Sequence, residues 1–137
     1  MRYLAVDPGG RRLGLAVGDN ETGVASALTV VPYRGVTEAA DLIVQRASAM
    51  GAGCVVVGLP TLEGGEEPPA CRRSHALAEA VSARGLPVVL QREHLTTNEA
   101  RRRARTIGLP ADRPVDHLAA QVLLEEFLAD APERGRR

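Results

Sequence analysis

The chain has 137 residues, a formal net charge of zero and 45% hydrophobic residues, a balance that is ordinary for a folded globular protein. Aromatic residues make up only 2% of the sequence, which argues against binding single strands by stacking bases on aromatic side chains. No run approaches the roughly 20 apolar residues of a membrane-spanning helix, and the first residues lack the pattern of a signal peptide.

Length and residue usage also set expectations for domains, compartment and partners. The length suits a single domain, which we expect over residues 1–131, followed by a disordered basic tail over residues 132–137. Cys54 and Cys71 lie far apart and outside metal-binding spacings, so we expect reduced thiols in a cytoplasmic protein. All 17 Lys and Arg positions are arginine, which suits phosphate binding, although a GC-rich genome would produce the same bias.

The first third of the chain has the pattern of three antiparallel strands. An apolar run over residues 3–6 leads to Asp7 and the turn sequence Pro8-Gly9-Gly10. A carboxylate at this strand end can bind a cation, or it can simply begin the turn. In the second strand, bulky residues alternate with Gly14, Ala16 and Gly18, which leaves one face nearly bare for the close approach of a helix or a ligand. A third strand is expected over residues 24–31.

Helices and strands then alternate along the chain. A helix capped by Thr37 and closed by Gly51 precedes an apolar run over residues 54–59, which is typical of a buried parallel strand. A loop leads to a helix over residues 70–83 and a fifth strand over residues 86–90. A capping box at Thr96 and Glu99 predicts a further helix, and a last helix is expected over residues 115–128. The order βββαβαβαα predicts an α/β fold whose mixed five-stranded sheet, a three-strand antiparallel meander plus two parallel strands, is flanked by helices.

Three acidic residues stand at points where this fold could bring the chain together. Asp7 ends the first strand, Glu93 follows the fifth strand, and Asp116 lies in the first turn of the last helix. Carboxylates are preferred ligands of Mg²⁺ and Mn²⁺, and two such ions can hold the attacking water and the leaving oxygen of a phosphodiester. Each acid also has a purely structural role open to it, in a turn, beside a helix cap or at a helix dipole.

Four sequence blocks carry a resemblance to a known family. They are Leu4-Ala5-Val6-Asp7-Pro8-Gly9 with Arg12-Leu13-Gly14-Leu15-Ala16-Val17, then Val55-Val56-Val57-Gly58-Leu59-Pro60, then Glu93-His94-Leu95-Thr96-Thr97-Asn98-Glu99-Ala100, and finally Val115-Asp116-His117-Leu118-Ala119-Ala120. With these blocks in order, the chain resembles the YqgF or RuvX family of Holliday-junction-resolvase-like proteins in the RNase H-like superfamily. The resemblance runs from Leu4 to about Phe127.

The resemblance implies a fold, an active site and an activity. It implies the RNase H-like fold and matches Asp7, Glu93 and Asp116 to the acidic active-site positions of the family. We expect these residues to bind Mg²⁺ or Mn²⁺, in a two-ion site where Asp7 bridges the ions. The implied activity is hydrolysis of phosphodiester bonds by an endonuclease that matures the small-subunit rRNA precursor, resolves branched DNA, or does both. The expected partners are therefore nucleic acid and ribosomal particles, and the protein is expected to be a monomer or a homodimer.

The block around Glu93 departs from the family pattern of Asp-Glu-Arg before Leu-Thr-Thr. Arg92 stands where the family usually has Asp. This difference removes an auxiliary metal ligand and is expected to lower the affinity of the site for the second ion. His94 replaces a permanent positive charge with a group that titrates near neutrality, so it either contacts a phosphate when protonated or lies on the surface. We expect Thr96 and Thr97, in the same block, to support the site.

Arginines are the expected contacts to the substrate, although a solvated surface is the commoner fate of such charges. The candidates are Arg11 and Arg12 in the first turn, Arg72 and Arg73 at the start of the second helix, and Arg101 and Arg105, one helical turn apart.

Two other functions fit parts of the sequence. The Asp7-Pro8-Gly9-Gly10 turn before a hairpin also looks like the phosphate loop of the actin and sugar-kinase superfamily, but those enzymes need a second lobe that 137 residues cannot supply. The alternative is a non-catalytic RNA- or ribosome-binding protein with a decayed site, which the neutral charge and Arg92 favour.

Overall fold

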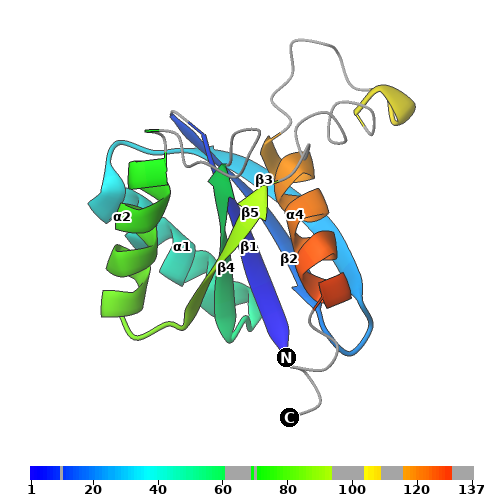
Figure 1. Ribbon diagram of the computed structural model, residues 1–137, viewed down its shortest axis with the longest axis horizontal. Helices are drawn as coiled ribbons and strands as arrows, with labels where there is room; N and C mark the ends of the chain where they lie inside the picture. The colour runs from blue at the N-terminus through cyan, green and yellow to red at the C-terminus, as the bar shows by residue number, and fades with distance from the viewer. Residues whose placement is uncertain (10, 61–68, 70, 94–103, 109–115, 131–137) are drawn as a thin grey trace.

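The computed structural model describes residues 1–9, 11–60, 69, 71–93, 104–108 and 116–130, and within them five strands form one mixed sheet (Figure 1). The strands are β1 (Arg2–Pro8), β2 (Arg12–Asp19), β3 (Val24–Pro32), β4 (Cys54–Pro60) and β5 (Val88–Glu93). Their order across the sheet is β3-β2-β1-β4-β5. The pairs β1–β2 and β2–β3 are antiparallel, whereas β1–β4 and β4–β5 are parallel. The predicted meander and the two added parallel strands are therefore confirmed.

Helices cover both faces of this sheet. They are α1 (Val36–Met50), α2 (Cys71–Ala83) and α4 (Asp116–Asp130), and residues 104–106 are also helical. In Figure 1, α1 and α2 lie on one side of the sheet and α4 lies on the other. The parallel strand β4 is thereby buried between two helical layers, which is the usual environment of such strands, whereas the edge strand β5 is only partly buried.

Two boundaries differ from the sequence predictions. Thr37 is not a helix cap, because α1 begins at Val36 after Gly35, which provides no side-chain hydrogen bond to the helix end. The fifth strand begins later and extends further than expected, so Glu93 is its last residue rather than a residue of the following loop. The strand continues because β5 pairs with β4 as far as the register Pro60–Glu93.

Strand alternation divides the core into two parts. Leu4, Val6 and other aliphatic residues of β1 and β2 pack with α1 and α2. Tyr3 and Ala5 point to the opposite face and pack with α4, where the Tyr3 ring meets the Phe127 ring edge-on at 5.1 Å. Asp7 follows Tyr3 and Ala5 in this alternation, so it belongs to the α4 face.

The nearly bare face of β2 is occupied by α4, which confirms the helix alternative. A Cβ atom on Gly14 would overlap the backbone carbonyl of Asp116, and a Cβ on Gly18 would lie 2.9 Å from the Leu124 side chain. The missing side chains therefore allow α4 to lie directly on the strand, with its first residue beside Gly14.

Some sequence expectations fall outside the described residues, namely the tail over 132–137, the capping box at residues 96–99 and most of the loop over 59–69. Cys54 and Cys71 are both buried free thiols, as expected. In the described part of the chain, no helix has the length and apolar character needed to cross a membrane.

Candidate active site

Asp7 lies near the end of β1, on the sheet face that α4 covers. Its cross-strand neighbour in β2 is Gly14, and α4 begins against that glycine. On the other side, β1 pairs with β4 up to the register Val6–Val57, so the next residue of β4 toward this end is Gly58. Two residues without side chains therefore flank Asp7, and the start of α4 and the Glu93 side chain occupy the space that their side chains would fill.

Glu93 reaches toward Asp7 across the backbone of β4. A Cβ atom built on Gly58 would lie 2.7 Å from Glu93 Oε1 and 2.9 Å from its Cδ, so the Glu93 side chain passes directly over this glycine. The two carboxyl groups meet in a side-chain hydrogen bond that is one of the causes of the raised pKa of Asp7. A glycine between the two strands is therefore what allows residues of β1 and β5 to touch.

Asp116 is the first residue of α4 and enters the site from the opposite direction. Its Oδ2 lies 3.2 Å from the position of a Cβ on Gly9, in the turn that follows Asp7. The same oxygen accepts a hydrogen bond and ion pair from Arg12 Nε at 3.3 Å. Asp116 is therefore close enough to Asp7 to affect its pKa, but its carboxylate is engaged with an arginine.

The electrostatics of Asp7 follow from this arrangement. Burial, the hydrogen bond with Glu93 and the negative charges of Glu93 and Asp116, in that order, raise the pKa of Asp7 well above its ordinary value. Without a cation, Asp7 therefore holds its proton to a higher pH than an ordinary aspartate does. A bound cation reverses such a preference because its charge stabilises all the carboxylates at once.

The carboxylates do not form a finished metal centre. In the part of the chain that the structure describes, no three His, Cys, Asp or Glu side chains are grouped closely enough to hold a metal ion. Asp7 and Glu93 are in contact, whereas Asp116 is directed to Arg12. The prediction that the three acids converge thus corresponds to a contacting pair with a third carboxylate nearby.

The predicted substrate arginines have different environments. Arg11 and Arg73 line one pocket beside the first turn, Arg12 is paired with Asp116, and Arg72 is exposed on α2. Arg105 is exposed beside the buried Ala104. The other candidates, Arg101, His94, Thr96 and Thr97, lie outside the described residues.

Arg92 does not occupy the carboxylate site. It is exposed and precedes Glu93 in β5, and successive strand residues point to opposite faces of a sheet. Because Glu93 points to the α4 face, the departure from the family pattern at Arg92 leaves the contact between Asp7 and Glu93 intact.

Two features of the site are missing from the sequence predictions. The first is the role of Gly58, for which the signal is an isolated glycine inside an apolar strand, a pattern that marks the close approach of another group. The second is Tyr33, whose hydroxyl donates a hydrogen bond of 2.9 Å to the carbonyl of Gly9 and so braces the turn after Asp7. No sequence signal distinguishes this tyrosine from an ordinary core residue.

Comparison with known proteins identifies the family of the chain. The sequence profile of the RuvX family, described as Holliday junction resolvase, matches residues 1–130. The chain belongs to the RuvX family. A relative from Anaeromyxobacter sp. (strain Fw109-5) is named "Putative pre-16S rRNA nuclease" and is 40% identical over 134 residues, covering 93% of this chain and 96% of the relative. A relative of the same name from Chloroflexus aurantiacus is 33% identical over 133 residues, covering 91% of this chain and 84% of the relative. Both the RuvX profile and these relatives support the predicted nuclease function.

Solved structures confirm the fold expected for the RuvX family. RuvC from T. thermophilus, in complex with a Holliday junction substrate, aligns with a TM-score of 0.61 at 19% identity, covering 95% of each chain. The Fowlpox virus resolvase, in complex with Holliday junction DNA, aligns with a TM-score of 0.57 at 8% identity, covering 95% of this chain and 98% of the resolvase. At these identities the likeness shows the shared RNase H-like fold.

Proposed function

We propose that this protein is a divalent-metal-dependent endonuclease that hydrolyses phosphodiester bonds in structured nucleic acid. The observation that carries the proposal is the half-buried pair of Asp7 and Glu93, formed across Gly58 on the α4 face, with Asp116 at the start of α4. Two carboxylates in contact repel each other when both are ionised, and a divalent cation between them offsets that repulsion.

The donor set fits Mg²⁺ or Mn²⁺, which prefer carboxylate oxygens. Asp7, Glu93 and Asp116 would hold the metal, in a site that we propose takes two ions. When bound, such ions lower the pKa of a coordinated water and stabilise the departing oxygen of a phosphodiester. Asp7 would contribute from β1 at the centre of the sheet and Glu93 from the edge strand β5, across β4, while α4 packed on Gly14 fixes the direction from which Asp116 approaches.

Arg12 has a direct part in this proposal. Its Nε lies 3.3 Å from Asp116 Oδ2, so the guanidinium and a metal ion compete for the same carboxylate. For both of its oxygens to join the metal site, Asp116 must exchange the arginine for the cation. Arg12 is half exposed and, once released, it can turn to a substrate phosphate, which its planar fork suits.

The substrates we propose are the precursor of the small-subunit rRNA and branched DNA. The first is supported by the name of the relatives and the second by the description of the RuvX family. Ribosomal particles are the proposed partners for the RNA reaction. Symmetric cutting of a junction needs two active sites, so a homodimer is proposed for that reaction and a monomer suffices for the other.

The alternative is a non-catalytic nucleic-acid-binding protein. It is favoured by the Arg12–Asp116 ion pair, which engages one of the three carboxylates.

The decisive experiment is a cleavage panel with a four-way DNA junction and a precursor 16S rRNA fragment, each with Mg²⁺, Mn²⁺ or EDTA. We expect metal-dependent cleavage by the wild-type protein and none by Asp7→Asn, with Arg46→Gln as an active control. Equal activity of wild type and Asp7→Asn would refute the assignment, and inactivity of both would favour the binding protein.

A further inference from the structure

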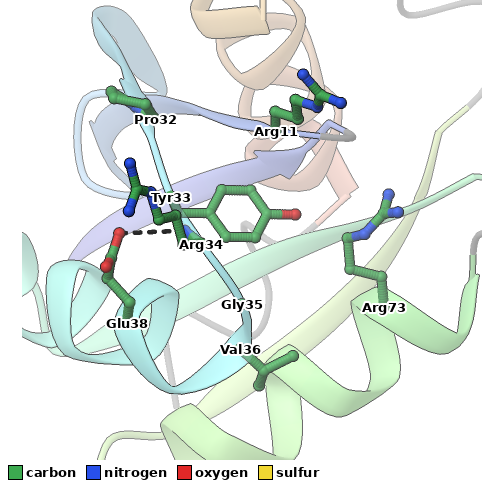
Figure 2. A pocket seen from close by; sticks show the side chains of 8 residues that line it. All are labelled: Arg11, Pro32, Tyr33, Arg34, Gly35, Val36, Glu38 and Arg73. Carbon is green, nitrogen blue, oxygen red and sulfur yellow. Dashed lines mark hydrogen bonds between the residues drawn. The ribbon is translucent and has the colours of Figure 1, made fainter.

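A pocket of about 730 Å³ opens beside the turn that follows Asp7 (Figure 2). Its lining comes from the first turn, the end of β3, the start of α1 and the start of α2, namely Arg11, Pro32, Tyr33, Arg34, Gly35, Val36, Glu38 and Arg73. In Figure 2 the Tyr33 ring extends across the pocket toward the side from which Arg73 projects. The volume lies within the range of pockets that hold small organic groups.

The charge of this pocket is strongly positive. Three of the lining residues are arginines and only Glu38 is acidic. The Glu38 carboxylate already accepts a hydrogen bond of 3.1 Å from the backbone N–H of Arg34. Within the described residues, neither the Arg11 nor the Arg34 guanidinium forms an ion pair, and Arg73 makes a single contact of 3.5 Å, to the carbonyl of Gly9. The positive charge is therefore largely uncompensated.

The start of α1 adds to the same potential. Gly35 and Val36, which begin this helix, line the pocket, and no side chain caps the helix end. The free N–H groups of a first helical turn carry partial positive charge and attract anions. The three arginines and the helix end therefore favour the same kind of ligand, an anion with several oxygen acceptors.

The pocket and the carboxylates share one peptide unit. Tyr33 donates its hydroxyl proton to the Gly9 carbonyl at 2.9 Å, and its backbone N–H donates to the Arg11 carbonyl at 3.1 Å. On the carboxylate side, the position of a Cβ on Gly9 is 3.2 Å from Asp116 Oδ2. The Gly9 turn therefore separates the two sites by the width of a single chain segment.

We propose that this pocket binds a backbone phosphate of the substrate strand, next to the phosphodiester that is cleaved at the carboxylates. Arg11, Arg34 and Arg73, whose guanidinium groups point in different directions in Figure 2, would turn to the phosphate oxygens, and Tyr33 fixes the turn between the two phosphates. The inference rests on the proposed nuclease function and adds a second phosphate site to it. It assigns substrate positioning to Arg34, which lies outside the carboxylate cluster.

The first test is binding measured in EDTA, where no cleavage occurs. A fluorescent four-way DNA junction and a precursor 16S rRNA fragment are titrated at several KCl concentrations with wild type, Arg34→Gln, Arg73→Gln and the control Arg46→Gln, an exposed arginine of α1 outside the pocket. Each pocket variant should lower the slope of log affinity against log salt by about 0.7–0.9, the loss expected for one phosphate contact. The control should keep the wild-type slope. Slopes for both pocket variants equal to that of Arg46→Gln would overturn the proposal.

The second test locates the phosphate on the substrate. Single methylphosphonate groups, which lack the phosphate charge, are placed one at a time along the strand. At one position near the cleaved bond, the substitution should weaken binding to wild type but not weaken binding to Arg73→Gln further, because coupled changes are non-additive. If every position weakens both proteins equally, the pocket holds no phosphate. Because both tests run without metal, their outcome is separate from whether the carboxylates catalyse cleavage.

Discussion

The replacement Gly58→Ala separates the stability of the fold from the assembly of the site. The added Cβ would lie 2.7 Å from Glu93 Oε1, 2.9 Å from Cδ and 3.2 Å from Cγ, which is too close for the present position of that side chain. All three atoms belong to a flexible side chain rather than to the backbone. We therefore expect Glu93 to swing away from Asp7 while the sheet stays as it is.

The expected magnitudes differ for the two properties. Alanine in place of a strand glycine restricts the unfolded chain and so raises the free energy of unfolding by about 0.5–1 kcal/mol. This gain offsets the small cost of moving the Glu93 side chain. The melting temperature should therefore stay within about 4 °C of wild type. Loss of the surroundings that position a metal ligand, here the Glu93 carboxylate, typically lowers metal affinity or activity by about 10–100-fold.

The assay pairs thermal unfolding with cleavage at varied Mn²⁺ concentration. We expect Gly58→Ala to fold like wild type. We also expect it either to need about 10–100-fold more Mn²⁺ for half-maximal cleavage or to be inactive. Gly53→Ala is a matched control, because the nearest atoms to its added Cβ are those of Met1 at 3.7 Å, in ordinary contact. Wild-type metal dependence in a folded Gly58→Ala protein would refute the role of this glycine.

Three further predictions follow from the site. In metal-free protein, the raised pKa of Asp7 means that the folded state binds this proton more tightly than the unfolded state does, so the stability from the proton is full below about pH 4 and declines as the pH rises. Urea unfolding should therefore show the stability of Asp7→Asn increasing relative to wild type above about pH 4. A difference in stability that does not change with pH would contradict this. Arg12→Gln should lower the half-saturating Mn²⁺ concentration by about 2–5-fold in a calorimetric titration, since an ion pair with a half-exposed arginine is worth about 1 kcal/mol or less. Unchanged or weaker binding would count against competition for Asp116. Gly14→Ala should destabilise by about 1–3 kcal/mol in urea unfolding because α4 must move off β2, and wild-type stability would show that the helix is not held there.

The sequence predicted the fold well because its signals are local. Period-two alternation in residues 13–18 and the apolar run over 54–59 each allow few structures, and the structure shows β2 and β4 at those places. The errors concern ends of elements. Thr37 has the chemistry of a cap, but the chain enters α1 through Gly35 instead, and β5 extends to Glu93 because pairing with β4 continues.

The site was less accessible to sequence reasoning, because its contacts join distant residues. Sequence identifies Asp7, Glu93 and Asp116 as candidates, but only the sheet register shows that Gly58 lies under the Glu93 side chain. The Arg12–Asp116 ion pair joins residues that are 104 positions apart, so Arg12 was expected on the substrate rather than on an acid. These are tertiary contacts, and a local pattern carries no information about them.

The central claim is that the three carboxylates form a metal site, and Mn²⁺ binding tests it most directly. Calorimetric titration of wild type, Asp7→Asn and the control Arg46→Gln with Mn²⁺ should show saturable binding to wild type and control that Asp7→Asn loses. Binding of equal strength and stoichiometry by wild type and Asp7→Asn, or no binding by wild type, would contradict the account.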